Sequence, residues 1–361
     1  MMYEDRSEEF PFVSVIIPVR NEEKYIRQCM QSLLMNDYPP DRIEFIIVDG
    51  ASTDRTRDAV FEMLAVDPRI KLLNNPNRTV PYSMNIGIRA AEGEYIVRVD
   101  AHAEYCRDYI RKSIETLQDT GAANVGGVWV VRPASKGFIA RAIALAQTHI
   151  FGVGNSSYRV SMRKGYKDTV PFGAFRRTIF EKVGLFNEKL TCHQDYELNL
   201  RSRKSGGGIY MNPAIVCKYY CRAGLRTLWR QSFQYGKWNA YCRAISKENA
   251  GLRHIFPGLV AAIATVLGVA AIVFKPAMWA FFGCAAFYLS VSLLASLQLF
   301  KRDRDVAAFF CPIVFPILHF GRGFGLIWGF ATRKHWVENV WQHVEAPILE
   351  PLPEKIIVRS A

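Results

Sequence analysis

Three short stretches of the chain place acidic or imidazole side chains where an apolar run ends or a helix is expected to begin. VDGASTDRT carries Asp49, VRVDAH carries Asp100 and His102, and TCHQDYELNLR carries Asp195 and Glu197. Such side chains can accept hydrogen bonds, bind a cation or take up a proton. Each stretch is therefore a candidate for chemistry, and each also has a plain structural explanation.

Asp49 can accept hydrogen bonds from a ribose or a base N–H, or it can simply cap the glycine turn that follows it. Asp100 and His102 are separated by one residue, so both can reach one divalent cation, or they can be the polar residues of a turn. The carboxylate suits Mg²⁺ or Mn²⁺ and the imidazole favours Mn²⁺. Such a cation would neutralise a departing diphosphate.

Asp195 and Glu197 stand beside an expected helix start, where negative charge is favourable without any catalysis. Alternatively, one of the two carboxylates removes the proton from an acceptor hydroxyl. The local sequence leaves both interpretations open.

The elements that must position these residues alternate between strands and helices. Apolar runs predict strands, and helical spacing predicts helices between them, the second opening at Ser52, Thr53 and Asp54. The first four strands are expected at residues 13–19, 44–48, 70–73 and 95–99. This alternation predicts an α/β fold with a mostly parallel sheet and helices on both faces. Open sheets of this kind bind ligands at the carboxyl ends of their strands.

Further strands are expected at residues 122–131 and 208–219, and a helix at 138–150, so the globular part is expected to end near Arg222. The net charge of +13 has much of its excess in residues 222–253. No nucleic-acid module accompanies it, so we expect no nucleic-acid partner and instead expect a surface that faces anionic membrane lipid.

Apolar segments fill the C-terminal part. Residues 255–274 and 276–300 carry no charge, and each has the about 20 residues that cross a bilayer as a helix. The third segment, 306–330, contains prolines, glycines, His319 and Arg322, and is expected either to span or to be re-entrant. Arg333 and Lys334 after it favour the second option, since both prefer the cytoplasm.

The compartment is indicated by the N-terminus and the cysteines. MMYEDRSEEF lacks the charged-then-apolar layout of a signal peptide, and the eight cysteines show no zinc-finger spacing. We therefore expect a multi-pass protein of the cell inner membrane whose catalytic domain is cytoplasmic.

Taken in order, the three stretches resemble the family 2 glycosyltransferases of the GT-A fold, over residues 11–222. VPFGAFRR and EKVGLFNEKL extend the resemblance. Together with the membrane tail, the chain is similar to the bacterial succinoglycan-type exopolysaccharide glucosyltransferases. The expected layout is a GT-A nucleotide-sugar-binding (Rossmann-like) domain, an amphipathic interfacial segment, a transmembrane helical region and a tail, at residues 1–222, 223–254, 255–330 and 331–361.

The resemblance implies roles for residues of the first domain. In IIPVRNE, Pro18 and Glu22 match residues beside the uridine of the donor. Asp49 matches the acid that recognises the base or ribose. Asp100, with His102, matches the DxD-type metal motif, whose final Asp is His here.

It also implies roles nearer the acceptor. Asp195 matches the second residue of the family's ED motif, the general base, and Gln194 replaces the Glu. Gln234, Lys237 and Trp238 in QYGKW resemble the QxxRW motif near the acceptor and pyrophosphate, with Lys in place of Arg. The same stretch can equally be an interfacial helix with its aromatic residues at headgroup level.

The activity implied by the resemblance is that of an inverting hexosyltransferase. It would move a sugar, glucose as first choice, from a UDP-sugar to a polyprenyl-diphosphate-linked or other membrane-proximal acceptor in exopolysaccharide or glycan biosynthesis, with Mn²⁺ or Mg²⁺. One alternative is a polyprenyl-phosphate monosaccharide synthase, whose acceptor needs no strong base. Another is a non-catalytic scaffold that binds nucleotide-sugars at the membrane, against which the intact acids argue.

Overall fold

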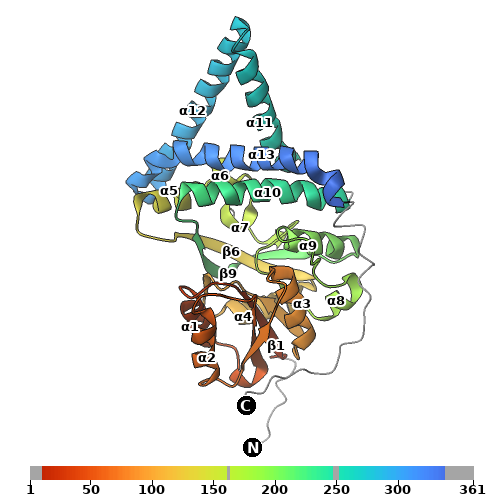
Figure 1. Ribbon diagram of the computed structural model, residues 1–361. Coiled ribbons are helices and arrows are strands. Elements are labelled where there is room, and N and C mark those ends of the chain that lie inside the picture. The colour runs from red at the N-terminus through yellow and green to blue at the C-terminus, as the bar shows by residue number, and fades with distance from the viewer. Residues whose placement is uncertain (1–9, 161–162, 247–251, 338–361) are drawn as a thin grey trace, which may run out of the picture. The chain divides into compact units, whose positions relative to one another are not determined.

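The computed structural model describes residues 10–160, 163–246 and 252–337, which form two compact units (Figure 1). Unit 1 contains the chain up to Val128 and again Arg163–Cys217. Unit 2 contains Trp129–Met162 and Lys218–His343. Residues 129–160 group with the C-terminal helices in unit 2, and the domain bounds expected from the sequence stay predictions.

Unit 1 is built on a mixed sheet with the strand order β3-β2-β1-β4-β8-β6-β9-β5 and with β7 paired to β9. The last residues of β6 and β9 belong to unit 2. The strands are β1 Val13–Val19, β2 Ile43–Asp49, β3 Ile70–Asn74, β4 Tyr95–Arg98, β5 Ala103–Tyr105, β6 Asn124–Pro133, β7 Gly165–Tyr166, β8 Ala174–Arg176 and β9 Ile209–Cys221.

The expectation of a mostly parallel sheet holds only for the first four strands. β1 pairs in parallel with β2 and β4, and β2 pairs in parallel with β3. The short strand β8 then pairs antiparallel with both β4 and β6. Strand patterns in the sequence do not specify partners, and a strand of three residues is too short to show a pattern.

The helices of unit 1 flank this sheet. They are α1 Ile26–Leu34, η1 Pro40–Arg42, α2 Thr56–Leu64, α3 Val80–Ala90, α4 Tyr109–Thr120, α8 Thr178–Val183 and α9 Gln194–Lys204. Every residue of β2 is buried, as expected for a strand covered on both faces. Ile16 of β1 packs in one core cluster with Met84 and Ile88 of α3. Gly87 of α3 permits this approach, because a Cβ there would lie 2.5 Å from the Ile16 side chain.

Two helix boundaries differ from the prediction. α2 begins at Thr56 rather than at Ser52, because Asp54 accepts hydrogen bonds from the Thr56 backbone and hydroxyl and so closes a turn before the helix. The helix expected over residues 138–150 ends at Ala146, and a separate short helix starts at Ile150.

Unit 2 is mainly helical, with α5 Phe138–Ala146, α6 Ile150–Val153, α7 Ser157–Val160, α10 Leu225–Ser246, α11 Leu252–Ala270, α12 Lys275–Asp303, η2 Val306–Phe310 and α13 Cys311–Trp336. The helix α12 and the stretch Val306–Trp336 are long and apolar enough to cross a membrane. The apolar part of α11, Ile255–Ala270, is shorter than that, and α11 ends at Ala270 rather than at residue 274.

The flanking segments are described only in part. α10 and the start of α11 fall in the expected interfacial segment 223–254, of which residues 247–251 lie outside the described residues. The expected tail 331–361 begins as the end of α13, and from residue 338 onward it lies outside the described residues.

Within unit 2, α13 lies along α10, whereas α11 and α12 form a hairpin (Figure 1). The helices α10 and α13 run in the same direction, because Gly321 faces Ser232 while Gly329 faces Lys237. Glycines make the contact close: a Cβ at Gly325 would lie 2.0 Å from the Phe233 carbonyl oxygen. Toward the C-terminal ends of α10 and α13, Tyr241 stacks on Trp336 with ring centroids 4.6 Å apart.

This close contact gives a stability prediction. Gly325→Ala is expected to cost about 1–3 kcal/mol, because the new methyl group meets backbone that must shift. The melting temperature in detergent, followed by intrinsic fluorescence, should fall by a few degrees. The matched control is Gly283→Ala in α12, where a Cβ meets nothing within 4 Å. Equal melting temperatures for both variants would contradict the close packing of α13 on α10.

Candidate active site

The carboxyl ends of three neighbouring parallel strands bring the predicted acids to one edge of the unit 1 sheet. Val19 at the end of β1 is in register with Asp49 of β2, and Ile16 of β1 is in register with Arg98 of β4. Asp100 follows β4 after one residue, Val99. The pairing of β1 with β4 ends before Pro18, because proline has no N–H to donate to a neighbouring strand.

The loops that leave β1 and β2 are tied to each other. The Asn21 backbone N–H donates to Ser52 Oγ at 2.9 Å, and the Thr53 N–H donates to Asn21 Oδ1 at 2.8 Å. Asn21 holds the left-handed conformation, φ 56°, that Asn adopts more readily than most residues. These contacts fix the backbone beside Glu22 and Asp49.

Asp49 is buried and has the turn-capping role that one interpretation predicted. Its carboxylate accepts a hydrogen bond from the Ser52 backbone N–H at 3.2 Å and pairs with Arg57 Nη1 at 2.8 Å. Recognition of a base or ribose by Asp49 stays a prediction. The structure supplies a fixed carboxylate at the correct strand end for it.

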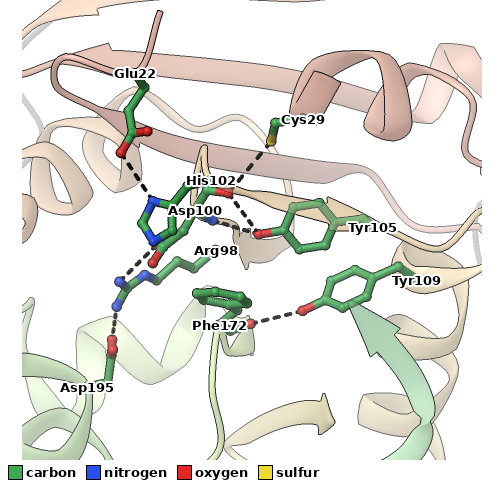
Figure 2. Close-up of polar contacts among 9 residues, drawn as sticks. All are labelled: Glu22, Cys29, Arg98, Asp100, His102, Tyr105, Tyr109, Phe172 and Asp195. Atoms are coloured by element: carbon green, nitrogen blue, oxygen red, sulfur yellow. Dashed lines mark hydrogen bonds and ion pairs between the residues drawn. The ribbon is translucent and has the colours of Figure 1, made fainter. Parts of the chain in front are cut away.

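At the centre of the edge, Arg98 joins two of the predicted acids (Figure 2). Its Nη2 donates to Asp100 Oδ1 at 3.0 Å and its Nη1 donates to Asp195 Oδ1. The Arg98 side chain is 5% exposed. Burial lowers the pKa of the guanidinium, but the two carboxylates raise it further, so the group stays charged. Arg98 thus fixes the distance between Asp100 and Asp195 as a cation shared by both.

Asp195 and Glu197, which the sequence could not separate, have different surroundings. Glu197 is bound at both oxygens by Arg201, at 2.7 and 2.8 Å. Asp195 lies in the first turn of α9, after His193 in the left-handed conformation, and its side chain keeps 33% of its surface exposed. Only Asp195 of this pair is therefore available to a substrate.

The surroundings of Asp195 also suit a base. Burial raises the pKa of its carboxyl, the Arg98 charge lowers it and the Asp100 charge raises it again, with a net rise. A carboxylate with a raised pKa accepts a proton more readily at neutral pH. Perturbed groups of this kind cluster at functional sites.

The residues fit a divalent cation that takes part of its coordination from a ligand. Asp100 Oδ2 has no hydrogen-bond partner among the described residues, while Tyr105 fixes the turn by accepting the Asp100 N–H at 2.7 Å. His102 Nδ1 lies 3.1 Å from Glu22 Oε1 (Figure 2). Within the described ranges, no group of three or more His, Cys, Asp or Glu residues can hold a metal alone. Mg²⁺ sites commonly combine one or two carboxylates with substrate phosphates, and a cation at Asp100 stays a prediction.

The predicted acceptor residues Gln234, Lys237 and Trp238 belong to α10 in unit 2. Gln234 is exposed, and Lys237 Nζ lies 5.4 Å from the ring centroid of Tyr241. Trp238 contacts Trp336 edge-on, with ring centroids 5.8 Å apart. These contacts show that Lys237 and Trp238 pack within unit 2. The role of the stretch near an acceptor and pyrophosphate, and its alternative place at headgroup level, stay predictions.

Arg98 is the site residue that the sequence analysis missed. A signal was present, because YIVRVD places a single charge inside an apolar strand run. A buried charge needs a partner of opposite sign, and the nearest candidates were the acids already singled out.

Comparisons with known proteins agree with this geometry. The family model "Glycosyl transferase family 2" matches residues 14–184. The succinoglycan biosynthesis protein ExoA of Rhizobium meliloti (strain 1021) is 32% identical over 254 residues, which cover 69% of this chain and 76% of that protein. A glycosyltransferase of Methanococcus voltae, whose name gives dolichyl N-acetyl-α-D-glucosaminyl phosphate as its acceptor, is 29% identical over 336 residues, or 90% and 99% of the two chains.

Among solved structures, the mannosyltransferase PcManGT from Pyrobaculum calidifontis, in complex with GDP-Man and Mn²⁺, aligns with a TM-score of 0.60 at 22% identity, covering 84% of this chain and 86% of that one. The mixed sheet with acids at its carboxyl edge is thus the GT-A fold of a glycosyltransferase. The chain belongs to glycosyltransferase family 2.

Proposed function

We propose that this glycosyltransferase moves a sugar from a UDP-sugar to a lipid-linked acceptor with inversion at the anomeric carbon. The observation that carries the proposal is the partly exposed carboxylate of Asp195, held by Arg98 beside Asp100. One partly exposed carboxylate that can act as a base suits a single displacement. The name of the Methanococcus voltae relative specifies a lipid-phosphate acceptor, which supports an acceptor of that class here.

In this mechanism Asp195 removes the proton from the acceptor hydroxyl as the hydroxyl attacks the sugar. Arg98 orients the carboxylate and keeps it ionised, while Glu22 and Asp49 contact the nucleoside. A divalent cation held at Asp100, with His102 as its second candidate ligand, would supply Lewis-acid stabilisation of the departing UDP. Inversion then gives a β-linkage from an α-linked donor.

Unit 2 supplies the membrane association. We propose that the hairpin of α11 and α12 enters the bilayer of the inner membrane, and that α13 lies at the interface on α10. Glycine-mediated contact along α10 accounts for the glycines of α13, which a helix surrounded by lipid would not need. The catalytic unit would then work on the cytoplasmic face.

The experiment is UDP release by the detergent-purified protein with Mn²⁺, screened over UDP-sugars with and without a membrane lipid extract. UDP-glucose comes first because of the succinoglycan relative. Uronic-acid donors come next, because the archaeal relative is named for a diacetamido-glucuronosyl group. We expect release from one donor that depends on lipid. Tight UDP binding without release from any donor would instead support a scaffold, and release that ignores lipid would contradict the lipid-linked acceptor.

Donor binding gives a separate prediction. Asp49→Asn keeps an oxygen for the Ser52 N–H but removes the charge, and should weaken UDP binding about tenfold if the carboxylate accepts hydrogen bonds from the nucleoside. Calorimetric titration with UDP measures this. The control is Asp58→Asn, an exposed acid of α2. Unchanged affinity for Asp49→Asn would restrict Asp49 to capping its turn.

A further inference from the structure

Arg159 and Arg322 of unit 2 have charges that no acidic side chain among the described residues neutralises. Arg159 lies on α7 and Arg322 on α13, and among the described residues neither forms an ion pair with a carboxylate. The two are close enough for the charge of Arg159 to act on Arg322. Their other electrostatic neighbours include the phenols of Tyr158 and Tyr235. Two neighbouring like charges without a counter-charge are unfavourable unless an anion joins them.

The faces of the Arg159 guanidinium are covered by aromatic rings. Its Cζ lies 4.7 Å from the ring centroid of Trp129 and 5.7 Å from those of Tyr158 and Tyr219. Trp129 and Tyr219 are themselves stacked, with centroids 4.0 Å apart. These cation–π contacts hold the guanidinium in place, and its N–H groups can still donate hydrogen bonds.

A buried amide beside Arg159 lacks an acceptor. Gln147 is 4% exposed, and its Oε1 accepts a hydrogen bond from Arg159 Nη1. Because arginine can only donate, the oxygen of the amide must face it, and the Nε2 group points elsewhere. That Nε2 has no hydrogen-bond partner within the described part of the chain. Buried donors are nearly always satisfied, so this one indicates an acceptor beyond the described residues, for which a bound ligand is a candidate.

We propose that Arg159, Arg322 and Gln147 bind a phosphate group carried by a membrane lipid. Planar guanidinium groups match phosphate oxygens, and the amide adds a neutral donor. A lipid can deliver the phosphate because the same unit contains the candidate membrane spans. The occupant we assign is the phosphate of the lipid-linked acceptor, and this part rests on the proposed function.

The test uses the full-length protein in nanodiscs of phosphatidylcholine alone, or with added undecaprenyl phosphate or phosphatidylglycerol. Native mass spectrometry measures the retained lipid, and free inorganic phosphate serves as competitor. The variants are Arg159→Gln and Arg322→Gln, and the matched control is Arg230→Gln, an exposed arginine of α10.

We expect the wild type to retain undecaprenyl phosphate at least about tenfold better than phosphatidylcholine. Each site variant should retain about tenfold less undecaprenyl phosphate than the wild type. The control variant should stay within about twofold of the wild type. Equal retention by wild type and both site variants would overturn the proposal. Retention of phosphatidylglycerol as strong as that of undecaprenyl phosphate would confirm a lipid-phosphate site and refute the acceptor as its occupant. Binding of free phosphate to a protein that retains neither undecaprenyl phosphate nor phosphatidylglycerol would refute a lipid as the ligand.

Two readouts keep the result interpretable. Arg159→Lys preserves the charge above the aromatic rings and should recover part of the retention lost in Arg159→Gln, even if the latter folds poorly. UDP binding by unit 1 is titrated in parallel and should be unchanged in all these variants. Conversely, Asp195→Asn should retain lipid as the wild type does. If the arginine variants lose lipid retention while the wild type turns over no UDP-sugar, the lipid site stands and only the proposed function fails.

Discussion

Asp195→Asn is expected to lower kcat by about 10²–10⁴-fold, the usual contribution of a positioned general base. The amide keeps the size of the side chain and can still accept a hydrogen bond from Arg98, but it cannot take the acceptor proton. Affinity for UDP should stay within about twofold, since Asp49 and Glu22 are unchanged. Lipid-dependent UDP release and calorimetric titration measure the two quantities.

The control is Glu181→Gln, an exposed acid of α8 that should behave as the wild type does. Full activity of Asp195→Asn would contradict the base assignment. It would favour the alternative of a polyprenyl-phosphate monosaccharide synthase, whose phosphate acceptor is already a nucleophile without a base.

Arg98→Met is expected to lower kcat/KM by about 10²-fold at neutral pH, because displacement of a catalytic group by about 1 Å has that cost. The substitution removes the cation that holds Asp100 and Asp195 together and leaves two carboxylates facing each other. Methionine fills similar volume but makes neither hydrogen bond.

The pH profile distinguishes this role from simple loss of structure. Asp195 must be ionised to act as a base, so activity falls as pH drops through its pKa. Arg98 lowers that pKa, so Arg98→Met should raise it and move the acid limb of kcat/KM to higher pH. Arg176→Met, an exposed arginine at the end of the neighbouring strand β8, should leave the limb in place. An unshifted limb in Arg98→Met would show that Arg98 does not act on the base.

The parallel half of the sheet was predictable because its strands and helices carry strong periodic signals. Residues 13–19 and 44–48 lie within one residue of the observed β1 and β2. Polar residues that follow such strands must meet at one edge, so the grouping of Glu22, Asp49 and Asp100 followed from the pattern alone. The family resemblance then added Asp195, which no local pattern connects to that edge.

The remaining features depend on contacts between distant residues. The Arg98 bridge joins positions 97 residues apart, so nothing in TCHQDYELNLR indicates that Asp195 is held by Arg98. The pairing of Glu197 with Arg201 is the exception, because their i,i+4 spacing on a helix is a local signal. The grouping of residues 129–162 with the C-terminal helices also arises only in three dimensions. Likewise, the sequence shows glycines in residues 306–330 without a role for them, and only the structure shows that they mark the close contact of α13 with α10.

The most direct test of the central claim is the anomeric configuration of the product. Once the donor is identified, the product formed from the α-linked UDP-sugar is examined by NMR for the one-bond C–H coupling at the new glycosidic carbon. A single displacement driven by Asp195 predicts a β-linkage. An α-linkage would show retention, which one base and one displacement cannot produce, and would contradict the account.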